Sequence, residues 1–271
     1  MDPVRALEPH VALRDVEMAF DDRVVFDGLS CAFARGRISV ILGGSGSGKS
    51  TLLRLIGGLV RPHAGRIEVA GRDITSLSER ELCDVRSRLG MLFQGGALLD
   101  SLTVYDNLAL PLRENTEASP AEIDARVRQR LAAVGLAGCE NLLPGQLSGG
   151  MLRRAALARA MISEPEILLC DEPFSGLDPL SLKRIESLLA GINHRFGTTL
   201  LVVSHHIPST MRLADQVLLL LPGRVVQGTP QELRASDDPE VAGFFNEDLD
   251  ESDEPGSNGW WDTIERGGAP S

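Results

Sequence analysis

Hydrophobic and polar positions alternate over the first part of the chain, which predicts β-strands with one covered face. Residues 11–34 fit two antiparallel strands that turn at residues 21–22. A short apolar run at 37–42 predicts a buried strand, and a glycine-rich loop then leads into a helix from about Lys49. Another strand is expected at 65–71, between two glycines. The first part of the chain therefore predicts a small antiparallel sheet beside the first strand of a core.

The middle of the chain changes to a helical period. Residues 76–160 are mostly helical in pattern, and Pro120 marks the start of the clearest helix. Two near-continuous apolar runs, at 166–173 and 198–206, suit strands covered on both faces of a mostly parallel sheet. A closing hairpin is expected to turn at residues 222–223. Helices alternating with buried strands predict an α/β fold.

Charge is distributed unevenly along the 271 residues, whose formal net charge is −11. From Asp237 to the end there are 11 acidic residues and one basic residue, so the preceding part is close to neutral. This charge distribution offers no basic region that would bind DNA or RNA. Residues 247–271 are rich in charge, Gly, Ser and Pro, and we expect them to form a disordered acidic tail that carries Trp260 and Trp261.

Hydropathy predicts no membrane span, because no apolar run approaches the roughly 18 residues that a bilayer needs. The first residues also lack the basic start and apolar centre of a signal peptide. We therefore expect the chain to stay in the cytosol and to contact a membrane only through partners.

A phosphate-binding loop lies between the predicted strand at 37–42 and the following helix, where it fits the pattern G-x-x-x-x-G-K-[ST]. Its glycines let backbone N–H groups converge on phosphates, Lys49 reaches the β- and γ-phosphate oxygens, and Ser50 places a hydroxyl on Mg²⁺. The expected nucleotide-binding positions of this loop are Gly43, Gly44, Ser45, Gly46, Ser47, Gly48, Lys49, Ser50 and Thr51.

Two acids end the buried strand at 166–173. Asp171 is expected to bind Mg²⁺ through water, and Glu172 to polarise an attacking water. A phosphate-binding loop alone does not separate kinases, GTPases and ATPases. The chain has no N-K-x-D motif for guanine, which lowers the GTPase interpretation.

Two further polar residues follow predicted strands. The amide of Gln94 is placed to touch both the metal and the attacking water, and His205 follows a strand at the edge where ligands gather in α/β sheets. Taken singly, each is as readily a surface or packing residue. Only in combination with the phosphate loop and the two acids do Gln94 and His205 indicate functional residues instead of surface or packing residues.

A second glycine-rich turn, at residues 148–150, opens another predicted helix and is also suited to an anion. The order of the phosphate loop, Gln94, "LSGGM", "LLCDEP", "SGLD" and "SHH" resembles the ABC-type ATPases from Val11 to about Leu233. The resemblance implies a P-loop NTPase fold of the ABC type. It adds an antiparallel β subdomain and a helical subdomain at about 95–160 to a mixed, mainly parallel core sheet.

The resemblance also explains why one chain has two phosphate-binding turns. In this family two domains pair head to tail, and each ATP is held between the loop of one chain and the signature turn of the other. Ser148, Gly149 and Gly150 would then bind the γ-phosphate held by a second copy. Asp178 resembles the residue that links the two sites. Phe20 matches the aromatic that stacks on adenine, although an amphipathic strand equally places it in the core.

Within the ABC group the sequence is most similar to the ATPases of Mla/Mce-type phospholipid transporters, on "LRLIGGLVRPHAGRI", the segment 91–114, "LSGGMLRRAALARA" and "CDEPFSGLDP". This likeness implies the ATPase of a complex that maintains outer-membrane lipid asymmetry, at the cytoplasmic face of the inner membrane. Its partners would be a second copy, a polytopic permease, an MCE-domain lipid-binding protein and a possible STAS-domain regulator. His206 departs from the family pattern, in which an acid is usual.

The same likeness implies that 1–246 form one nucleotide-binding domain. It places the groove for a permease helix at 95–113, with apolar contacts from Leu98, Leu99, Val104 and Tyr105. We expect the tail to dock on the second ATPase copy or on the regulator. Three alternatives remain: the ATPase of another importer or exporter, a non-transport ABC protein, and a monomeric kinase. The non-transport proteins carry two fused domains or long insertions, and a kinase needs neither "LSGGM" nor "SGLD".

Overall fold

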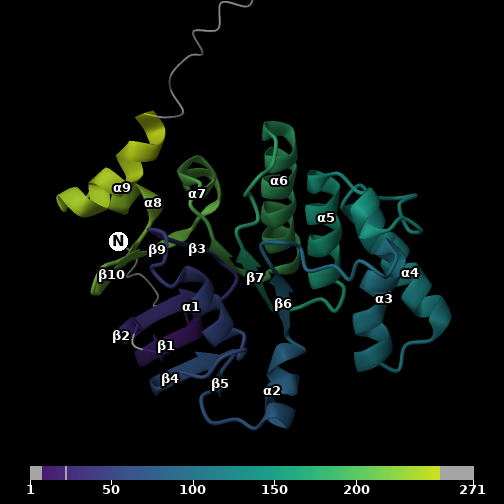
Figure 1. Cartoon of the computed structure of the whole chain (residues 1–271), viewed down its shortest axis with the longest axis horizontal. Helices are drawn as coiled ribbons and strands as arrows, with labels where there is room; N and C mark the ends of the chain where they lie inside the picture. The colour runs from purple at the N-terminus through teal and green to yellow at the C-terminus, as the bar shows by residue number, and fades with distance from the viewer. Residues whose placement is uncertain (1–7, 22, 251–271) are drawn as a thin grey trace, which may run out of the picture.

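The computed structural model describes residues 8–21 and 23–250 (Figure 1). Its last helix, α9 (Pro239–Asp250), reaches into positions 247–250 of the segment predicted to be a disordered tail. The remainder of that segment, with Trp260 and Trp261, lies outside the described residues. The predicted mixed α/β architecture is confirmed, with one antiparallel and one mainly parallel sheet.

The predicted N-terminal hairpin is present as two long strands paired antiparallel, with Phe20 opposite Arg23. Alternating apolar residues place one face of this hairpin on the core. The antiparallel sheet has the order β2 (Arg23–Ala34), β1 (Pro9–Phe20), β4 (Ala64–Val69) and β5 (Arg72–Asp73).

The core sheet has six strands, of which five are parallel. The last strand pairs antiparallel with its neighbour through the predicted turn at residues 222–223. The spatial order is β10 (Arg224–Gly228), β9 (Gln216–Leu221), β3 (Ile38–Gly43), β8 (Thr199–Val203), β7 (Ile167–Asp171) and β6 (Leu89–Leu92).

The predicted helical region at 76–160 contains four α-helices, interrupted by β6. The helix expected at Pro120 begins there, because Ser119 and Glu122 form a capping box and Pro120 occupies the first position. The remaining helices cover the sheets or follow them along the chain. The helices besides α9 are α1 (Lys49–Ile56), α2 (Glu79–Arg86), α3 (Val104–Asn115), α4 (Pro120–Ala133), α5 (Gly149–Ala160), α6 (Pro179–Phe196), α7 (Ile207–Leu213) and α8 (Pro230–Arg234).

The near-continuous apolar strands are explained by cover on both faces of the parallel sheet. Along β8, Leu201 and Val203 join the cluster on the α1 side, whereas Leu200 and Val202 join the cluster on the α6 side. All four side chains are at most 1% exposed. Since successive side chains of a strand point to opposite faces, a strand covered on both sides must be apolar throughout.

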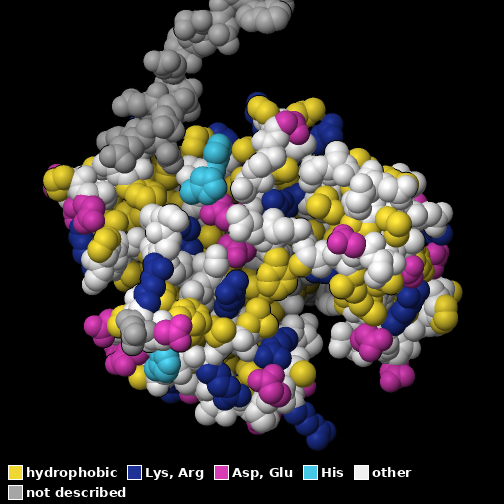
Figure 2. Space-filling model, viewed as in Figure 1, with side chains coloured by type: hydrophobic (Ala, Val, Ile, Leu, Met, Phe, Trp, Pro, Cys, Tyr) yellow, Lys and Arg dark blue, Asp and Glu magenta, His cyan; other side chains and the backbone are white. Residues whose placement is uncertain are grey.

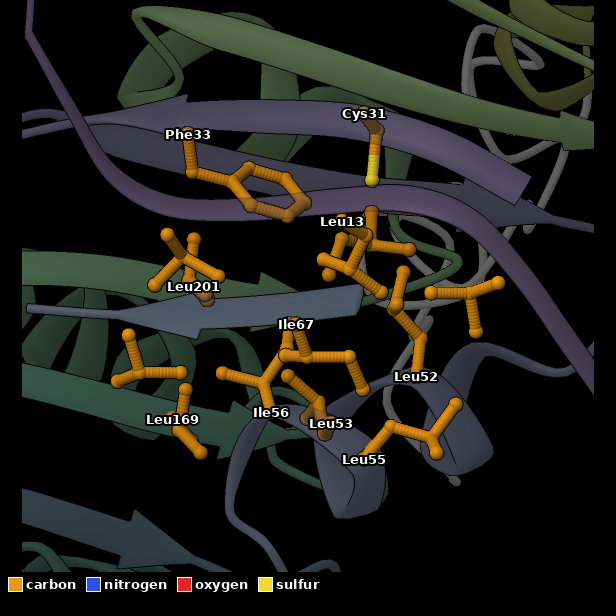
Figure 3. Packing of buried hydrophobic residues seen from close by; sticks show 14 of the residues in the cluster. Leu13, Cys31, Phe33, Leu52, Leu53, Leu55, Ile56, Ile67, Leu169 and Leu201 are labelled. Carbon is orange, nitrogen blue, oxygen red and sulfur yellow. The ribbon is translucent and has the colours of Figure 1, made fainter. Parts of the chain in front are cut away.

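Helix α1 fills the space between the two sheets (Figure 3). Its Leu52, Leu53, Leu55 and Ile56 are fully buried, and they pack with residues of both sheets, among them Phe33 of β2. Burial of each such side chain contributes about 1.5–3 kcal/mol. The packing holds the start of α1, and with it the phosphate loop, firmly against the sheet.

A third cluster belongs to the helices α3, α4 and α5 and includes Val104, Leu108, Val127 and Leu131. These helices lie at the far end of the molecule from α9 (Figure 1). Basic and acidic side chains are interspersed over the face seen in Figure 2, in keeping with the near-neutral charge of the chain before its acidic end. In the described part of the chain, no helix has the length and apolar character needed to cross a membrane.

A polar cluster around the buried His10 and Thr199 joins the two sheets. His10 of β1 is 3% exposed, and its Nδ1 lies 2.7 Å from Thr199 Oγ1 of β8. Its Nε2 lies 3.5 Å from Glu166 Oε2, and Arg88 donates to the other oxygen of Glu166 at 2.6 Å. Burial and the nearby Arg35 lower the pKa of His10 below its ordinary value, in spite of Glu166.

This burial predicts an acid-sensitive contribution to stability. The unfolded chain takes up a proton on His10 as the pH falls below 6.5, while the folded chain resists it, so His10 lowers the free energy of unfolding over that range. We expect a His10→Gln variant to be less stable at neutral pH but to lose less stability between pH 7 and pH 5. Urea unfolding at several pH values measures both effects. Parallel pH curves for the two proteins would contradict this prediction.

Candidate nucleotide-binding site

The phosphate loop bridges β3 and α1 as predicted. Gly48 caps α1 with φ 97°, a left-handed conformation that favours glycine. A side chain at Gly48 would also meet Val25 Cγ1 at 2.6 Å and Phe26 Cζ at 2.8 Å, so this position needs glycine twice over. The free N–H groups and dipole of α1 therefore begin where a phosphate group would sit.

Lys49 folds back over this loop. Its Nζ donates hydrogen bonds to the carbonyl oxygens of Gly43 at 2.7 Å and Gly44 at 3.0 Å. Burial lowers the pKa of the Lys49 ammonium, against the opposing effect of Glu172 and Asp171. Ser47 Oγ is buried and has no hydrogen-bond partner among the described residues. A loop with a cation and an unpaired buried hydroxyl is suited to a bound phosphate.

Oxygen atoms from two elements meet next to the loop. Ser50 Oγ in the first turn of α1 donates to Asp171 Oδ1 at the end of β7, at 3.1 Å. Hydroxyl and carboxylate oxygens are ligands that Mg²⁺ prefers. The described residues contain no group of three or more His, Cys, Asp or Glu side chains that would hold a metal by themselves. The pair fits a magnesium ion that completes its coordination with ligands from outside these two residues.

Glu172 is held in an uncommon conformation. Its φ is 49°, in the left-handed region, and its N–H donates to the carbonyl of Val203 on the neighbouring strand at 3.0 Å. The residue is 9% exposed, and its Oε2 lies 2.9 Å from His205 Nδ1. The structure thus brings together two of the predicted catalytic side chains. Strained, buried carboxylates of this kind gather at functional sites.

Gln94 follows β6 and is exposed. Its backbone is tied to α5 by Arg153, which donates to the carbonyl oxygens of Phe93 and Gln94 and, at 3.2 Å, to that of Ser175. Arg153 was missed by the sequence analysis. The sequence shows only that an arginine lies in α5, four residues after Gly149. The carbonyl groups that it binds are distant in sequence, so the pattern did not indicate them.

Arg23 was missed as well. It stands at the start of β2, and its Nη2 donates to the carbonyl oxygen of Gly46 at 3.0 Å. This contact brings the β1–β2 turn, with Phe20 on the paired strand, next to the phosphate loop. Phe20 is 43% exposed, which leaves its ring accessible to a nucleotide base.

The second glycine turn, at residues 148–150, lies at the start of α5 and next to the start of α6. Ser148 caps α5 by accepting from Met151 N–H, and both Ser148 and Gly149 are exposed. A side chain on Gly150 would lie 2.4 Å from Ser181 Oγ, so α5 closely approaches α6 there. Asp178 caps that helix by accepting from Leu180 and Ser181 N–H groups, each at 3.0 Å.

The cavity found beside the phosphate loop does not include the second glycine turn. Beside the phosphate loop, a cavity is lined by residues of β2, the loop, the β9–β10 turn and α9, and by none of α5. The turn at 148–150 therefore stands open beside the start of α6, on a different part of the surface.

The predicted permease groove needs one correction. Val104 is fully buried in the cluster of α3, α4 and α5, so its side chain cannot contact a partner. Leu98 and Tyr105 are partly buried against the same cluster, and Leu99 is 47% exposed. The alternation of apolar residues at 95–113 therefore reflects packing of the helical cluster at least as much as a surface.

Fold and site together define an ATP-binding cassette. Residues 26–175 match the family model of ABC transporters, and the chain belongs to this family. Over 237 residues it is 44% identical to MlaF of Escherichia coli K12, the intermembrane phospholipid transport system ATP-binding protein. The match covers 87% of this chain and 88% of that protein.

Two further likenesses are informative. The chain is 40% identical to a probable ribonucleotide transport ATP-binding protein, mkl, of Mycobacterium tuberculosis H37Rv, over 87% of this chain and 66% of that protein. A dimeric ATP-binding cassette solved in a post-hydrolysis state with ADP and Pi matches with a TM-score of 0.75. Its sequence is 30% identical, over 81% of this chain and 98% of that chain. The predictions of an ABC fold and of an ATPase subunit of an ABC transporter are confirmed.

Removal of the loop cation gives a first test of the site. We expect Lys49→Ala to weaken ATP binding by about 10- to 100-fold, since a hydrogen bond to a charged group contributes about 1.5–3 kcal/mol. Fluorescent-nucleotide titration of the full-length chain measures this change. Lys183, the chain's second lysine, is exposed on α6, and Lys183→Ala is the matched control. Equal losses in the two variants would contradict the assignment of Lys49.

Proposed function

We propose that this chain powers phospholipid transport as the ATPase of an Mla/Mce-type transporter, by closing on ATP as a head-to-tail pair. The observation that carries the proposal is the separation of its two phosphate-binding turns. The loop at 43–51 and the turn at 148–150 are each suited to phosphate, yet the cavity at the loop includes no residue of α5. A second copy facing the opposite way supplies the missing turn to each loop.

In this arrangement Ser148, Gly149 and Gly150 bind the γ-phosphate of an ATP held by the partner's loop. Ser148 and Gly149 are exposed, as this role requires. Asp178 lies at the start of α6, which α5 approaches at Gly150, so it reaches the same interface and links the two sites. The solved cassette with ADP and Pi is a dimer, which supports the pairing.

Hydrolysis uses the groups at the ends of β7 and β8. Glu172 accepts a proton from a water molecule whose oxygen attacks the γ-phosphorus, and the bond to the β–γ bridging oxygen breaks to leave ADP and Pi. Lys49 and the start of α1 stabilise the charge on the transferring group. His205, 2.9 Å from Glu172, orients that carboxylate and contacts the γ-phosphate, and Gln94 positions the water.

Ser50 and Asp171 would hold Mg²⁺, with Gln94 as a further ligand, and the ion would supply positive charge against the phosphate oxygens. Phe20 stacks on the adenine ring, next to the loop that Arg23 contacts. Residues 1–246 form one nucleotide-binding domain, with α3, α4 and α5 as its helical subdomain at about 95–160.

The likeness to MlaF over most of both chains supports phospholipid as the substrate. The chain acts at the cytoplasmic face of the inner membrane, where two copies bind a polytopic permease. An MCE-domain lipid-binding protein and a STAS-domain regulator complete the complex. Leu99 and the exposed surface around it form the groove for the permease helix. The acidic tail docks on the second copy or the regulator.

Mixed assemblies test the head-to-tail pairing. A copy with Lys49→Ala paired with a copy carrying Ser148→Arg leaves one pocket intact, because the two defects fall in the same composite pocket. We expect this mixed pair to hydrolyse ATP at about half the unmodified rate, and each variant paired with itself to be inactive. Tandem affinity tags isolate the mixed pair for the measurement.

Nucleotide binding by the isolated Ser148→Arg chain is the control, and it should equal that of the unmodified chain. The pairing is wrong if the mixed assembly is no more active than the two uniform ones.

Transfer of lipid tests the substrate. In a reconstituted complex, fluorescent phospholipid should move between donor and acceptor vesicles only with ATP, and this movement should stop in the Lys49→Ala complex. The similarity to mkl makes labelled ribonucleoside monophosphates the matched alternative cargo. ATP-dependent movement of the nucleotide, with none of the lipid, would overturn the phospholipid proposal.

A further inference from the structure

Three carboxylates are buried among the residues that the structure describes: Asp171, Glu172 and Glu186. The first two belong to the nucleotide site. Glu186 lies in the middle of α6 and is 8% exposed, and the proposed mechanism gives it no part. A buried carboxylate is costly unless donors surround it, so its contacts indicate what it is kept for.

All the side-chain donors found at Glu186 come from the short helix α7. Ser209 Oγ donates to its Oε1, Arg212 Nη2 donates to the same oxygen at 2.5 Å, and Arg212 Nε donates to Oε2 at 3.2 Å. The two nitrogens of one guanidinium thus bind the two oxygens of one carboxylate, a geometry that fixes orientation as well as distance. Glu186 fastens α7 to α6.

The contacts continue from α7 to the loop before it. Ser209 N–H donates to His206 Nδ1 at 3.1 Å, and Ser209 Oγ lies 2.7 Å from the same nitrogen. On the other side, His206 N–H donates to Ser204 Oγ at 2.9 Å. His205 stands between these two held residues, so its backbone is fixed from both neighbours.

This backbone is what positions His205. Its side chain is 66% exposed, so packing does little to hold the ring, yet Nδ1 lies 2.9 Å from Glu172. A hollow lies beside these residues, lined also by Ser175, Gly176 and Arg212. The ion pair of Glu186 and Arg212 therefore lies beside the catalytic groups without touching the reacting atoms.

Asp178 caps the start of helix α6, about two turns before Glu186. Because a helix moves as a rigid rod, a shift of its start at the dimer interface carries Glu186 along, and through it α7. We propose that Glu186 is a positioning residue for ATP hydrolysis: it holds α7 so that His205 meets Glu172, and it couples this contact to the interface end of α6. The inference rests on the proposed roles of His205 and Glu172.

A double-mutant cycle tests the proposal in the assembled transporter with the full-length chain. We expect Glu186→Gln to lower kcat by about tenfold and to leave the ATP affinity within about twofold, since small misplacements of a catalytic group slow the reaction. In a His205→Ala background the same substitution should change the single-turnover rate by less than about twofold, because its target is gone.

The matched control is Glu166→Gln. Glu166 also binds an arginine, Arg88, at 2.6 Å, but it lies before the start of β7, at the opposite end from Asp171. Its loss should lower the melting temperature without lowering kcat. Where Glu186→Gln fails to fold, Ser209→Ala replaces it, because this variant removes the hydroxyl that contacts both Glu186 and His206 Nδ1 and keeps the pair of Glu186 with Arg212.

The results distinguish the positioning role of Glu186 from the proposed function of His205. An unchanged kcat in Glu186→Gln, or an equal loss in the His205→Ala background, would overturn the positioning role and leave Glu186 a structural ion pair. Full hydrolysis by His205→Ala itself would overturn the proposed function of His205 instead. Loss of kcat only when His205 is present supports the inference.

Discussion

Three parallel strands in one register hold the nucleotide site together. Ile41 of β3 pairs with Val203 of β8, and Val203 pairs with Asp171 of β7, so β7 and β8 end level and β3 continues two residues further, to Gly43. Each strand then delivers a functional group within a residue or two: the phosphate loop, His205 and Glu172. All three strands are buried on both faces, and a slip of one residue would exchange two apolar faces and separate these groups.

The strain at Glu172 follows from this register. A left-handed φ of 49° in a non-glycine residue costs on the order of 1–3 kcal/mol. The conformation persists because the Glu172 N–H continues the pairing of β7 by donating to Val203. The chain therefore leaves the sheet sharply, and the carboxylate turns toward His205 instead of following the strand. A regular extended residue here would point its side chain out of one face of the sheet instead.

Sequence patterns predicted the features that depend on neighbouring residues along the chain. The phosphate loop, the acids after β7 and the buried strands follow from spacing and burial alone, and the structure places them as such motifs require. Patterns could not show that Val104 is buried. An apolar residue on one face of an amphipathic helix produces the same pattern whether it packs in the core or contacts a partner. Arg23 and Arg153 were missed because their partners are backbone carbonyls, which leave no mark in a sequence.

Arg153 shows how the helical cluster is joined to the core sheet. Its guanidinium binds the carbonyl of Gln94, which follows β6, and that of Ser175, which precedes α6, while its own helix begins at the exposed turn capped by Ser148. One planar fork thus fixes three segments that the proposed mechanism requires to act together. A lysine has a single ammonium on a flexible stem and cannot span both carbonyls in this geometry. Arg153 therefore joins the helix that begins at the exposed turn directly to the segments that follow β6 and precede α6.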